Sequence, residues 1–382
     1  MSAGLVTMRL VDRWIAVGST SKLDSWSVSA VREAIAQVSD GTPIRRILTS
    51  VVDVMVACTA TDMHALSPRL MAYGQALEYD AKWSLAADAY TTISTYTHPV
   101  EDADIAIASS LQLGFSLRTL GQLDAAASAY SRAADFAATV GDRVGNLRGR
   151  LGDAKIALAK GNFPKAEAVL ASIVEEARDH DLTDMRSRAL HDRAVLEGHR
   201  GKFEDSVRYA YEALGLSPSP IEKGRILTNI ATSFRNLGRL DVARDAYLVL
   251  AATAQEQYVR WWSEVSLMEI AAAEGNRLQF DRYRRELERA DFTPMLRISY
   301  LMDVGQGYRS FDECELAIPA FEQAIELASK HGYNRQLFEA EAALGEAKRG
   351  ARKPPAAAAP ELSFEALSVG EAIHKLKEAV CV

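Results

Sequence analysis

Arginine side chains recur at regular distances in the middle of this chain. Arg148, Arg188 and Arg225 are separated by 40 and 37 residues. A guanidinium group donates two parallel hydrogen bonds to a carboxylate or a phosphate, so a row of arginines on one surface would bind an anionic group. Alternatively, these arginines are solvated side chains that pair with Asp or Glu of neighbouring helices. The spacing alone leaves both interpretations open.

Motifs of catalysis are missing from the sequence. It contains no HExxH, no GxSxG, no phosphate-binding Walker loop and no strand-associated GxGxxG. His191, Asp192 and His199 share one segment, but two histidines eight residues apart on a helix cannot chelate a metal without a third ligand. We interpret them as solvated or hydrogen-bonded, and the pair Glu175 and Glu176 as an exposed helix surface. The sequence therefore predicts a protein that is not an enzyme and holds no cofactor or metal.

Composition restricts the class of protein further. The 382 residues are 48% apolar and 25% charged, with only 11 prolines, which favours a folded, helix-rich chain. The formal net charge of −7 argues against a nucleic-acid partner or an anionic membrane. Cys58, Cys314 and Cys381 are far apart, which argues against a disulfide framework or a zinc site. With no long apolar run and no signal-peptide pattern, we expect a cytoplasmic protein.

The elements that would position these side chains repeat along the chain. Glycines stand at steps of 40, 40, 37 and 37 residues, at Gly121, Gly161, Gly201, Gly238 and Gly275. Extending the steps reaches a sixth glycine at position 41, whereas positions 81 and 312 hold alanine and aspartate. On both sides of these glycines, apolar residues follow at i, i+3, i+4 and i+7, except around Gly275, where Arg277 and Arg284 stand at expected apolar places. This pattern predicts two amphipathic helices joined by a short turn.

Small and large residues alternate within each unit. The unit of Gly238, for example, carries Leu227, Ile230, Ala231 and Phe234 before the turn, then Ala243 and Tyr247 after it. These letters resemble the tetratricopeptide repeat over residues 65–330, and more weakly over 24–60. The repeats are longer than the usual 34 residues and mostly lack the first aromatic, and they look like those of bacterial regulatory and sensor proteins. The resemblance implies an all-α, right-handed superhelical solenoid of antiparallel helix hairpins, with about seven repeats and capping helices.

The chain divides into four predicted regions. Residues 1–64 form N-terminal helices, near 27–39 and 43–59, as a degenerate first repeat or a cap. Residues 65–349 form the solenoid, and its last helix, from 335 to 348, covers the open apolar end. Residues 350–362 are a linker rich in proline and alanine. Residues 363–382 contain an amphipathic helix that either folds back on the solenoid or engages a partner.

The resemblance also implies which positions face a ligand. In the family, positions 2, 5, 9 and 12 of the first helix line the concave groove, when the turn glycine is position 15. The basic and hydrogen-bonding residues at or beside these positions are Arg118, Arg148, Lys155, Arg188, Arg225, Asn229 and Arg235. They predict a site for an acidic peptide, a carboxylate or a phosphorylated segment. The lysine and asparagine clamp of chaperone-binding members is not matched, and of Trp261 and Trp262 one indole is expected in the core.

Three functions are compatible with the sequence. The first is a scaffold that binds a protein or peptide in the concave groove. The second is a regulatory sensor, similar in plan to the peptide-pheromone-responsive regulators of Gram-positive bacteria, in which a small peptide switches a partner. The third, an enzyme with an unrecognised site, has no group of residues in its favour. The sequence identifies neither the partner nor the oligomeric state.

Overall fold

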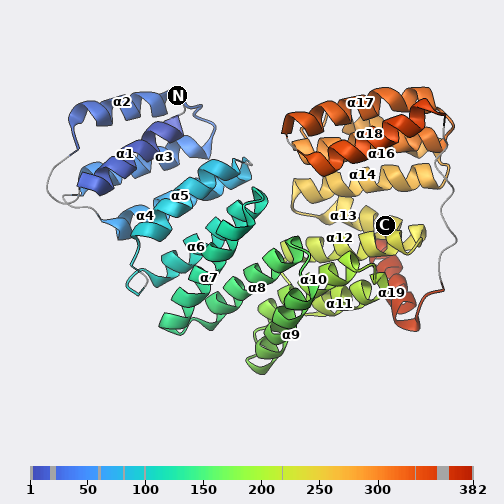
Figure 1. Ribbon diagram of the computed structural model, residues 1–382, viewed down its shortest axis with the longest axis horizontal. Coiled ribbons are helices and arrows are strands. Elements are labelled where there is room, and N and C mark those ends of the chain that lie inside the picture. Colours follow the sequence, from blue (N-terminus) through green and yellow to red (C-terminus); the bar gives the residue numbers. More distant parts are fainter. Residues whose placement is uncertain are drawn as a thin grey trace. The chain divides into compact units, whose positions relative to one another are not determined.

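The computed structural model describes residues 3–17, 23–58, 62–80, 82–98, 100–216, 218–331, 333–350 and 361–380. Within these ranges all regular secondary structure is α-helical, in the helices α1 to α19 (Figure 1). The chain divides into two compact units, Met1–Met185 and Arg186–Val382. The predicted all-α solenoid of helix hairpins is therefore confirmed.

Among its described residues, the first unit contains nine complete helices. They are α1 (Ala3–Val17), α2 (Ser25–Ala36), α3 (Pro43–Ala57), α4 (Met63–Tyr79), α5 (Trp83–Tyr96), α6 (Ala103–Thr119), α7 (Leu123–Val140), α8 (Arg143–Ala159) and α9 (Phe163–Asp179). Each helix packs against the next one in the sequence, and α4, α6 and α8 also contact one another in turn. The hairpins α4–α5, α6–α7 and α8–α9 therefore stack with their first helices adjacent.

The second unit continues the same arrangement. Its helices are α10 (Thr183–His199, which begins at the unit boundary), α11 (Phe203–Gly215), α12 (Pro220–Asn236), α13 (Leu240–Thr253), α14 (Gln257–Ala273), α15 (Arg277–Leu287), α16 (Pro294–Ser310), α17 (Cys314–His331), α18 (Asn334–Lys348) and α19 (Phe364–Val380). The first helices α12, α14, α16 and α18 contact one another in sequence. We call the face that they form the inner face.

The turn residues explain the spacing of the glycines. Gly121, Gly161, Gly201, Gly238 and Gly275 all have φ between 72° and 76°, a left-handed conformation that glycine adopts without steric cost. Asp312 stands 37 residues after Gly275, where the next turn glycine would be, and has φ 67°. Aspartate is among the few other residues that tolerate this region. The predicted hairpin register is therefore confirmed from Gly121 to Asp312.

The N-terminal helices do not share this turn. Helix α2 ends at Ala36, six residues before the N-cap of α3, and Gly41 between them has no left-handed φ. Pro43 opens α3, as its fixed φ and missing N–H favour. The predicted equivalent at position 81 lies outside the described residues, as does most of the predicted linker.

Glycines inside the first helices lie directly under aromatic rings of the second helices. The pairs are Gly74 with Tyr90, Gly114 with Tyr130 and Gly305 with Phe321. A Cβ atom on these glycines would stand 2.5 to 2.7 Å from the nearest ring carbon, which is closer than packed atoms allow. The alternation of small and large residues therefore fixes how closely the two helices of a hairpin approach.

Candidate functional site

A hollow lies on the inner face of the second unit. Its volume is about 320 Å³. Four consecutive first helices supply its lining, which consists of Arg235 from α12, Trp262, Val265, Ser266 and Glu269 from α14, Ile298, Ser299, Met302, Asp303 and Gln306 from α16, and Gln336 and Glu339 from α18. Figure 1 shows α14 and α16 side by side at this face.

The lining residues occupy equivalent positions of successive hairpins. Those of α14 and α16 form four pairs 37 residues apart, namely Trp262 and Ser299, Val265 and Met302, Ser266 and Asp303, and Glu269 and Gln306. Counted back from Gly275 and Asp312 as position 15, these are positions 2, 5, 6 and 9. Positions 2, 5 and 9 are among those expected to face the ligand, and here they surround a hollow.

Carboxylates outnumber cations in this hollow. Glu269, Asp303 and Glu339 line it together with a single guanidinium, that of Arg235. Arg235 forms an ion pair with Glu269. Burial lowers the pKa of Arg235, but the charges of Glu269, Tyr247 and Asp303 outweigh it and raise the pKa above its ordinary value. The lining therefore carries a formal charge of −2, from three carboxylates and one guanidinium.

The two adjacent tryptophans are both half-buried and pack against the hydrophobic core of the second unit, but only Trp262 lines the hollow. The Trp261 indole meets the Phe292 ring edge-on, with centroids 5.3 Å apart, and packs against the hydrophobic core of the second unit. The Trp262 indole lines the hollow and stacks on Tyr258 with centroids 6.4 Å apart. An aromatic face held in this way offers a surface for an apolar or cationic ligand group.

Three of the predicted site residues belong to the first unit. Arg148 and Lys155 lie two turns apart on α8, and Arg118 lies near the end of the adjacent helix α6. The Arg118 guanidinium stands 5.4 Å from the centroid of the Phe115 ring. Arg148 is exposed and forms no ion pair with any described residue, whereas Lys155 is half-buried.

The other predicted site residues lie in the second unit, within a network of charges. Arg225 binds Glu256 through two hydrogen bonds, from Nε at 3.2 Å and from Nη2 at 3.0 Å. Beside it, Nδ1 of His191 lies 3.1 Å from Oε1 of Glu222, whose side chain is only 9% exposed. Burial raises the pKa of Glu222. The His191 hydrogen bond and the charges of His191, Arg188 and Arg225 lower the pKa by more than burial raises it, so that it falls to about 2. The arginines on these helices thus stabilise a carboxylate of the protein itself.

Asn229 and Arg235 are also engaged by neighbouring side chains. The amide oxygen of Asn229 accepts a hydrogen bond from Ser206 at 3.2 Å, and Arg235 is paired with Glu269. The partners Glu256 and Glu269 both come from the next hairpin, about one repeat further along the sequence. Arg235 thus lines the hollow, whereas the other three residues do not. Arg188 lies on α10, and Arg225 and Asn229 lie on α12. Binding of a ligand by the predicted residues remains a prediction.

Sequence reasoning missed most of the hollow. Glu269, Met302 and Asp303 were not predicted because only basic residues and Asn229 were taken as ligand-binding at the inner-face positions, and Gln306 was interpreted as a packing residue of its helix. The sequence nevertheless contains the information. Positions 5 and 9 of the first helix, counted from Gly275 or Asp312 as position 15, reach all four residues or their immediate neighbours. The acidic and aromatic residues at or beside these positions, Trp262, Glu269 and Asp303, mark the hollow in the sequence.

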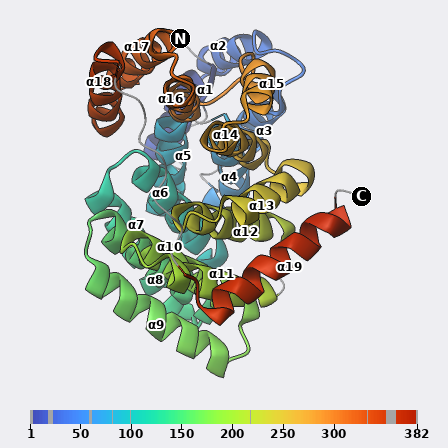
Figure 2. The same cartoon turned by 90° about the vertical axis from the view of Figure 1, so that its right-hand side faces the viewer.

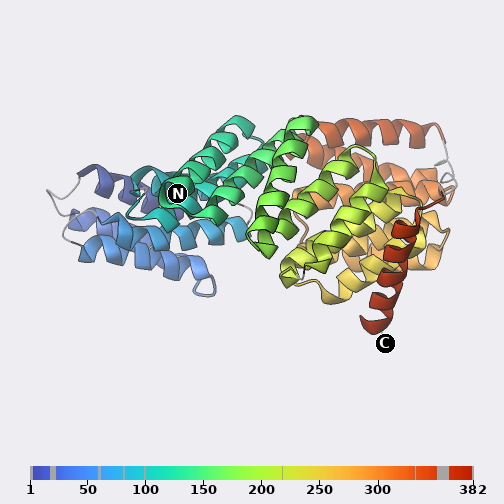
Figure 3. The same ribbon diagram turned by 90° about the horizontal axis from the view of Figure 1, so that it is seen from below.

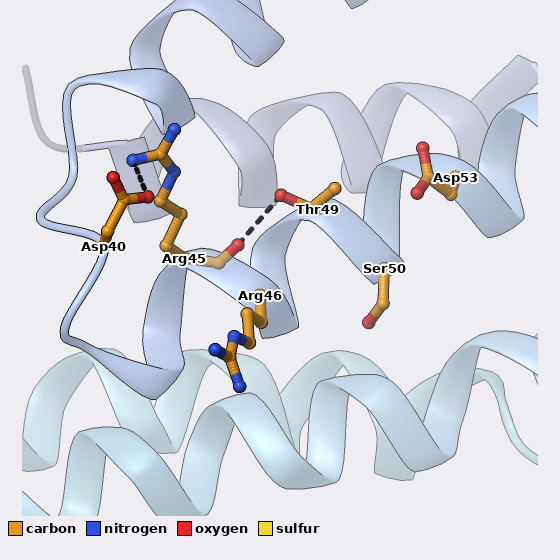
Figure 4. Close-up of a pocket in the computed structure, with 6 residues that line it drawn as sticks. All are labelled: Asp40, Arg45, Arg46, Thr49, Ser50 and Asp53. Atoms are coloured by element: carbon orange, nitrogen blue, oxygen red, sulfur yellow. Dashed lines mark hydrogen bonds and ion pairs between the residues drawn. The ribbon is translucent and has the colours of Figure 1, made fainter.

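A second hollow, along α3 and the turn before it, has a different character (Figure 4). It measures about 510 Å³ and is lined by Asp40, Arg45, Arg46, Thr49, Ser50 and Asp53. Arg45 pairs with Asp40, and Asp53 accepts a hydrogen bond from Arg32 at 2.8 Å. Its lining includes no apolar side chain, and most of its charges neutralise one another, so it lacks the mixed lining typical of ligand sites.

The described part of the chain shows neither a group of metal ligands nor a membrane-spanning helix. Across these residues, no three or more His, Cys, Asp or Glu side chains are grouped so that they could hold a metal ion. None of the described helices combines the length and the apolar character needed to cross a membrane.

Comparison with known proteins gives matches only among solved structures. No family model and no curated protein matches the sequence. The Rap conjugation gene regulator of plasmid pLS20, solved with the Phr* peptide, superposes with a TM-score of 0.53 at 12% identity, covering 91% of this chain and 96% of that chain. A Rap protein complexed with competence and sporulation factor gives 0.53 at 12% identity over 85% and 91% of the two chains.

A third match is a signal transduction ATPase with numerous domains from Pyrococcus horikoshii, which has a tetratricopeptide repeat sensor. Its TM-score is 0.51 at 10% identity, over 82% of this chain and 54% of that chain. The chain has a tetratricopeptide-like repeat fold. At these identities the likeness concerns the fold alone, so the function of this tetratricopeptide-like protein has to be argued from its own residues.

Proposed function

We propose that this chain is a peptide-binding scaffold, and that its ligand lies on the inner face at the hollow between α12, α14, α16 and α18. The observation that carries the proposal is the lining itself. Equivalent positions of successive hairpins supply a ring of polar, apolar and aromatic side chains around about 320 Å³, within the range of small-ligand pockets. Two structural neighbours, the pLS20 regulator and the Rap protein with competence and sporulation factor, were solved with a bound peptide or factor, which supports a ligand of this class.

The charge of the hollow favours a basic side chain in that peptide. A lysine or arginine would meet the carboxylates of Asp303 and Glu339 and the face of the Trp262 indole. Met302 and Val265 would contact the aliphatic part of the same side chain. A peptide with a basic residue next to an apolar one therefore fits this lining best.

Fluorescence anisotropy with labelled heptapeptides tests the proposal. One set carries a central lysine or arginine, and a matched set carries glutamate at the same place. We expect the basic set to bind more tightly, and Trp262→Ala and Asp303→Asn each to weaken binding at least about tenfold, or about 1.4 kcal/mol. Glu341→Gln, an exposed carboxylate of α18 outside the hollow, is the control. Equal binding of the two peptide sets, or unchanged affinity in both variants, would refute the assignment.

An acidic segment is the second candidate ligand, on the predicted arginine positions. Arg148 supports it, because this side chain is exposed and has no ion-pair partner among the described residues. Arg225 and Arg235 support it less, since an acidic ligand would have to displace Glu256 and Glu269. Binding of a glutamate-rich peptide that falls with Arg148→Glu and with rising salt would favour this ligand.

The names of the neighbours suggest a regulatory role as well. The pLS20 protein is a gene regulator, and the Pyrococcus horikoshii protein carries its repeats as a sensor. In a sensor, the peptide would change the arrangement of the hairpins and so switch a partner protein. Small-angle scattering with and without a bound peptide tests this role, and an unchanged profile at saturation would argue for a scaffold that does not switch.

A further inference from the structure

A third hollow lies between α13, α14 and α15 in the second unit. Its volume is about 400 Å³, and no residue that lines it also lines the hollow on the inner face. We call it the outer hollow, because α13 and α15 are the second helices of their hairpins. The C-terminal helix α19 packs on α13 as well, and on α11, as Figures 2 and 3 show.

Helix α13 meets α19 and the outer hollow with different side chains. Nδ1 of His374 in α19 lies 2.7 Å from Oδ2 of Asp245. The outer hollow is lined instead by Arg244 and Leu248 of α13, which lie one turn apart on that helix. None of the described residues of α19 lines the outer hollow. The contact with α19 and the outer hollow are therefore separate features of α13.

The outer hollow lies where neighbouring hairpins carry aromatic rings. Four residues before the turn position of each hairpin, α12 has Phe234 and α16 has Tyr308, whereas α14 has Ala271. The Tyr308 ring meets the Phe280 ring of α15 edge-on, with centroids 5.5 Å apart. One repeat of 37 residues earlier, the same two positions hold Ala271 and Ala243. Two rings are thus replaced by methyl groups where α13 meets α14, and Ala271 lines the space beside them.

Apolar side chains line the outer hollow on the side of α14. Leu267, Ile270 and Ala271 are at most 4% exposed, and Leu248 of α13 is half-buried. An apolar group placed against these side chains gains the free energy of leaving water. The volume of the outer hollow lies within the range of small-ligand pockets. A ring like those of Phe234 and Tyr308 therefore suits this lining.

Cations dominate the charge of the outer hollow. Arg244 and Arg282 line it with a single carboxylate, that of Glu274, so the lining carries a formal charge of +1. Arg244 pairs with Glu274 at 2.5 Å. Arg282 donates from Nε to Glu286 at 3.1 Å, and both of these side chains are more than half exposed, so their pair contributes little to stability. The terminal nitrogens of Arg282 form no hydrogen bond with a described residue, and a ligand carboxylate can bind them.

Tyr283 adds a hydrogen-bond donor beside Arg282. The Arg282 guanidinium stands 5.5 Å from the centroid of the Tyr283 ring, and both side chains line the outer hollow. Burial raises the pKa of the Tyr283 phenol, so the hydroxyl keeps its proton at neutral pH. A protonated phenol donates to a carboxylate oxygen. The outer hollow thus combines an apolar side with donors for an anion.

We propose that the outer hollow binds a small aromatic carboxylate. The ring of this ligand lies against Leu267, Ile270 and Ala271, in the space that an aromatic side chain of α14 would fill. Its carboxylate binds the terminal nitrogens of Arg282, and Arg244 adds a second positive charge to the lining. The hollow on the inner face has a formal charge of −2 and favours cations, so the two hollows select ligands of opposite charge.

The test titrates the full-length chain with para-fluorophenylpropionate and follows the ligand by fluorine NMR. For a ligand of this size we expect a Kd on the order of a millimolar or below. The neutral amide of the same molecule should bind at least about tenfold more weakly, because it forms no ion pair with Arg282. Fluoroacetate, which has the charge but no ring, should also bind at least about tenfold more weakly.

Four variants determine where the ligand binds. Ala271→Phe gives α14 the ring that α12 carries at Phe234, and Arg282→Gln removes the cation that binds the carboxylate. Each should weaken binding at least about tenfold. Arg285→Gln, an exposed arginine of α15 outside the lining, should leave the Kd unchanged. Trp262→Ala, which alters only the hollow on the inner face, should leave it unchanged as well.

Several results would overturn the proposal. Without detectable binding at millimolar ligand, or with equal binding of the carboxylate and its amide, the outer hollow is not a site for this ligand. An unchanged Kd in Ala271→Phe with native helicity by circular dichroism has the same meaning, and so does a loss of binding in Trp262→Ala. If Ala271→Phe reduces helicity, Arg282→Gln and Arg285→Gln are compared alone, and equal Kd values for these two variants overturn the proposal.

Discussion

The buried carboxylate of Glu222 makes the stability of the second unit depend on pH in the acid range. Its pKa is lowered from 4.5 to about 2 in the folded chain, because the favourable interactions with His191, Arg188 and Arg225 outweigh the cost of burial. A group with a lowered folded pKa stabilises the fold above its unfolded pKa, and this stabilisation is lost as the pH falls toward the folded value. For Glu222 the window therefore runs from about pH 4.5 down to about pH 2.

Glu222→Gln removes the charge while keeping the shape of the side chain. Lowering the pKa from 4.5 to about 2 corresponds to about 3 kcal/mol of stability. We therefore expect the variant to be less stable than the parent by about 3 kcal/mol at pH 5.5, and by less than about 1 kcal/mol at pH 2.5, where the parent has lost most of the stabilisation by its carboxylate.

Urea unfolding at the two pH values measures this difference. Replacing Trp14, Trp26 and Trp83 by phenylalanine leaves Trp261 and Trp262 as fluorescent reporters, both in the second unit. Glu326→Gln, an exposed carboxylate of the same unit, is the control and should change the free energy of unfolding little at either pH. A difference between Glu222→Gln and its parent that is the same at pH 5.5 and pH 2.5 would refute the reasoning.

Three further predictions concern packing, a turn and a surface ion pair. Gly305→Ala should lower the free energy of unfolding by about 1–3 kcal/mol in chemical denaturation, because its Cβ atom would lie 2.5 Å from the Phe321 ring; an unchanged midpoint would show that the hairpin tolerates a wider separation. Asp312→Gly should raise the free energy of unfolding by up to about 1 kcal/mol, since φ is 67° at this turn, and a lower midpoint would contradict this account. Arg32→Ala should cost less than about 1 kcal/mol, because both partners of its pair with Asp53 are more than half exposed; a larger loss in thermal unfolding would mean that the pair is better ordered than its exposure suggests.

The sequence by itself determined the hairpins. Helix, turn and the close contact inside a hairpin depend on residues within about 40 positions, and each leaves a local mark. Gly238 marks a left-handed turn, and Gly305 lies under Phe321 because only hydrogen fits there. Because these glycines recur from hairpin to hairpin, a wrong assignment of one turn does not shift the predicted positions of the other hairpins. The same count reaches Trp262 and Met302, which line the hollow, although only basic residues and Asn229 were predicted from it.

The tertiary structure alone decided which of these side chains meet. Arg225 and Arg235 could equally have faced a ligand, but Glu256 and Glu269 of the next hairpin lie within ion-pair distance of them. The hollow collects residues from four helices, and α19 returns to α13 across 129 residues between His374 and Asp245. Local patterns specify the conformation of each hairpin, whereas ion pairs and docking depend on distances of a few ångströms between separate elements, which only the packed chain defines.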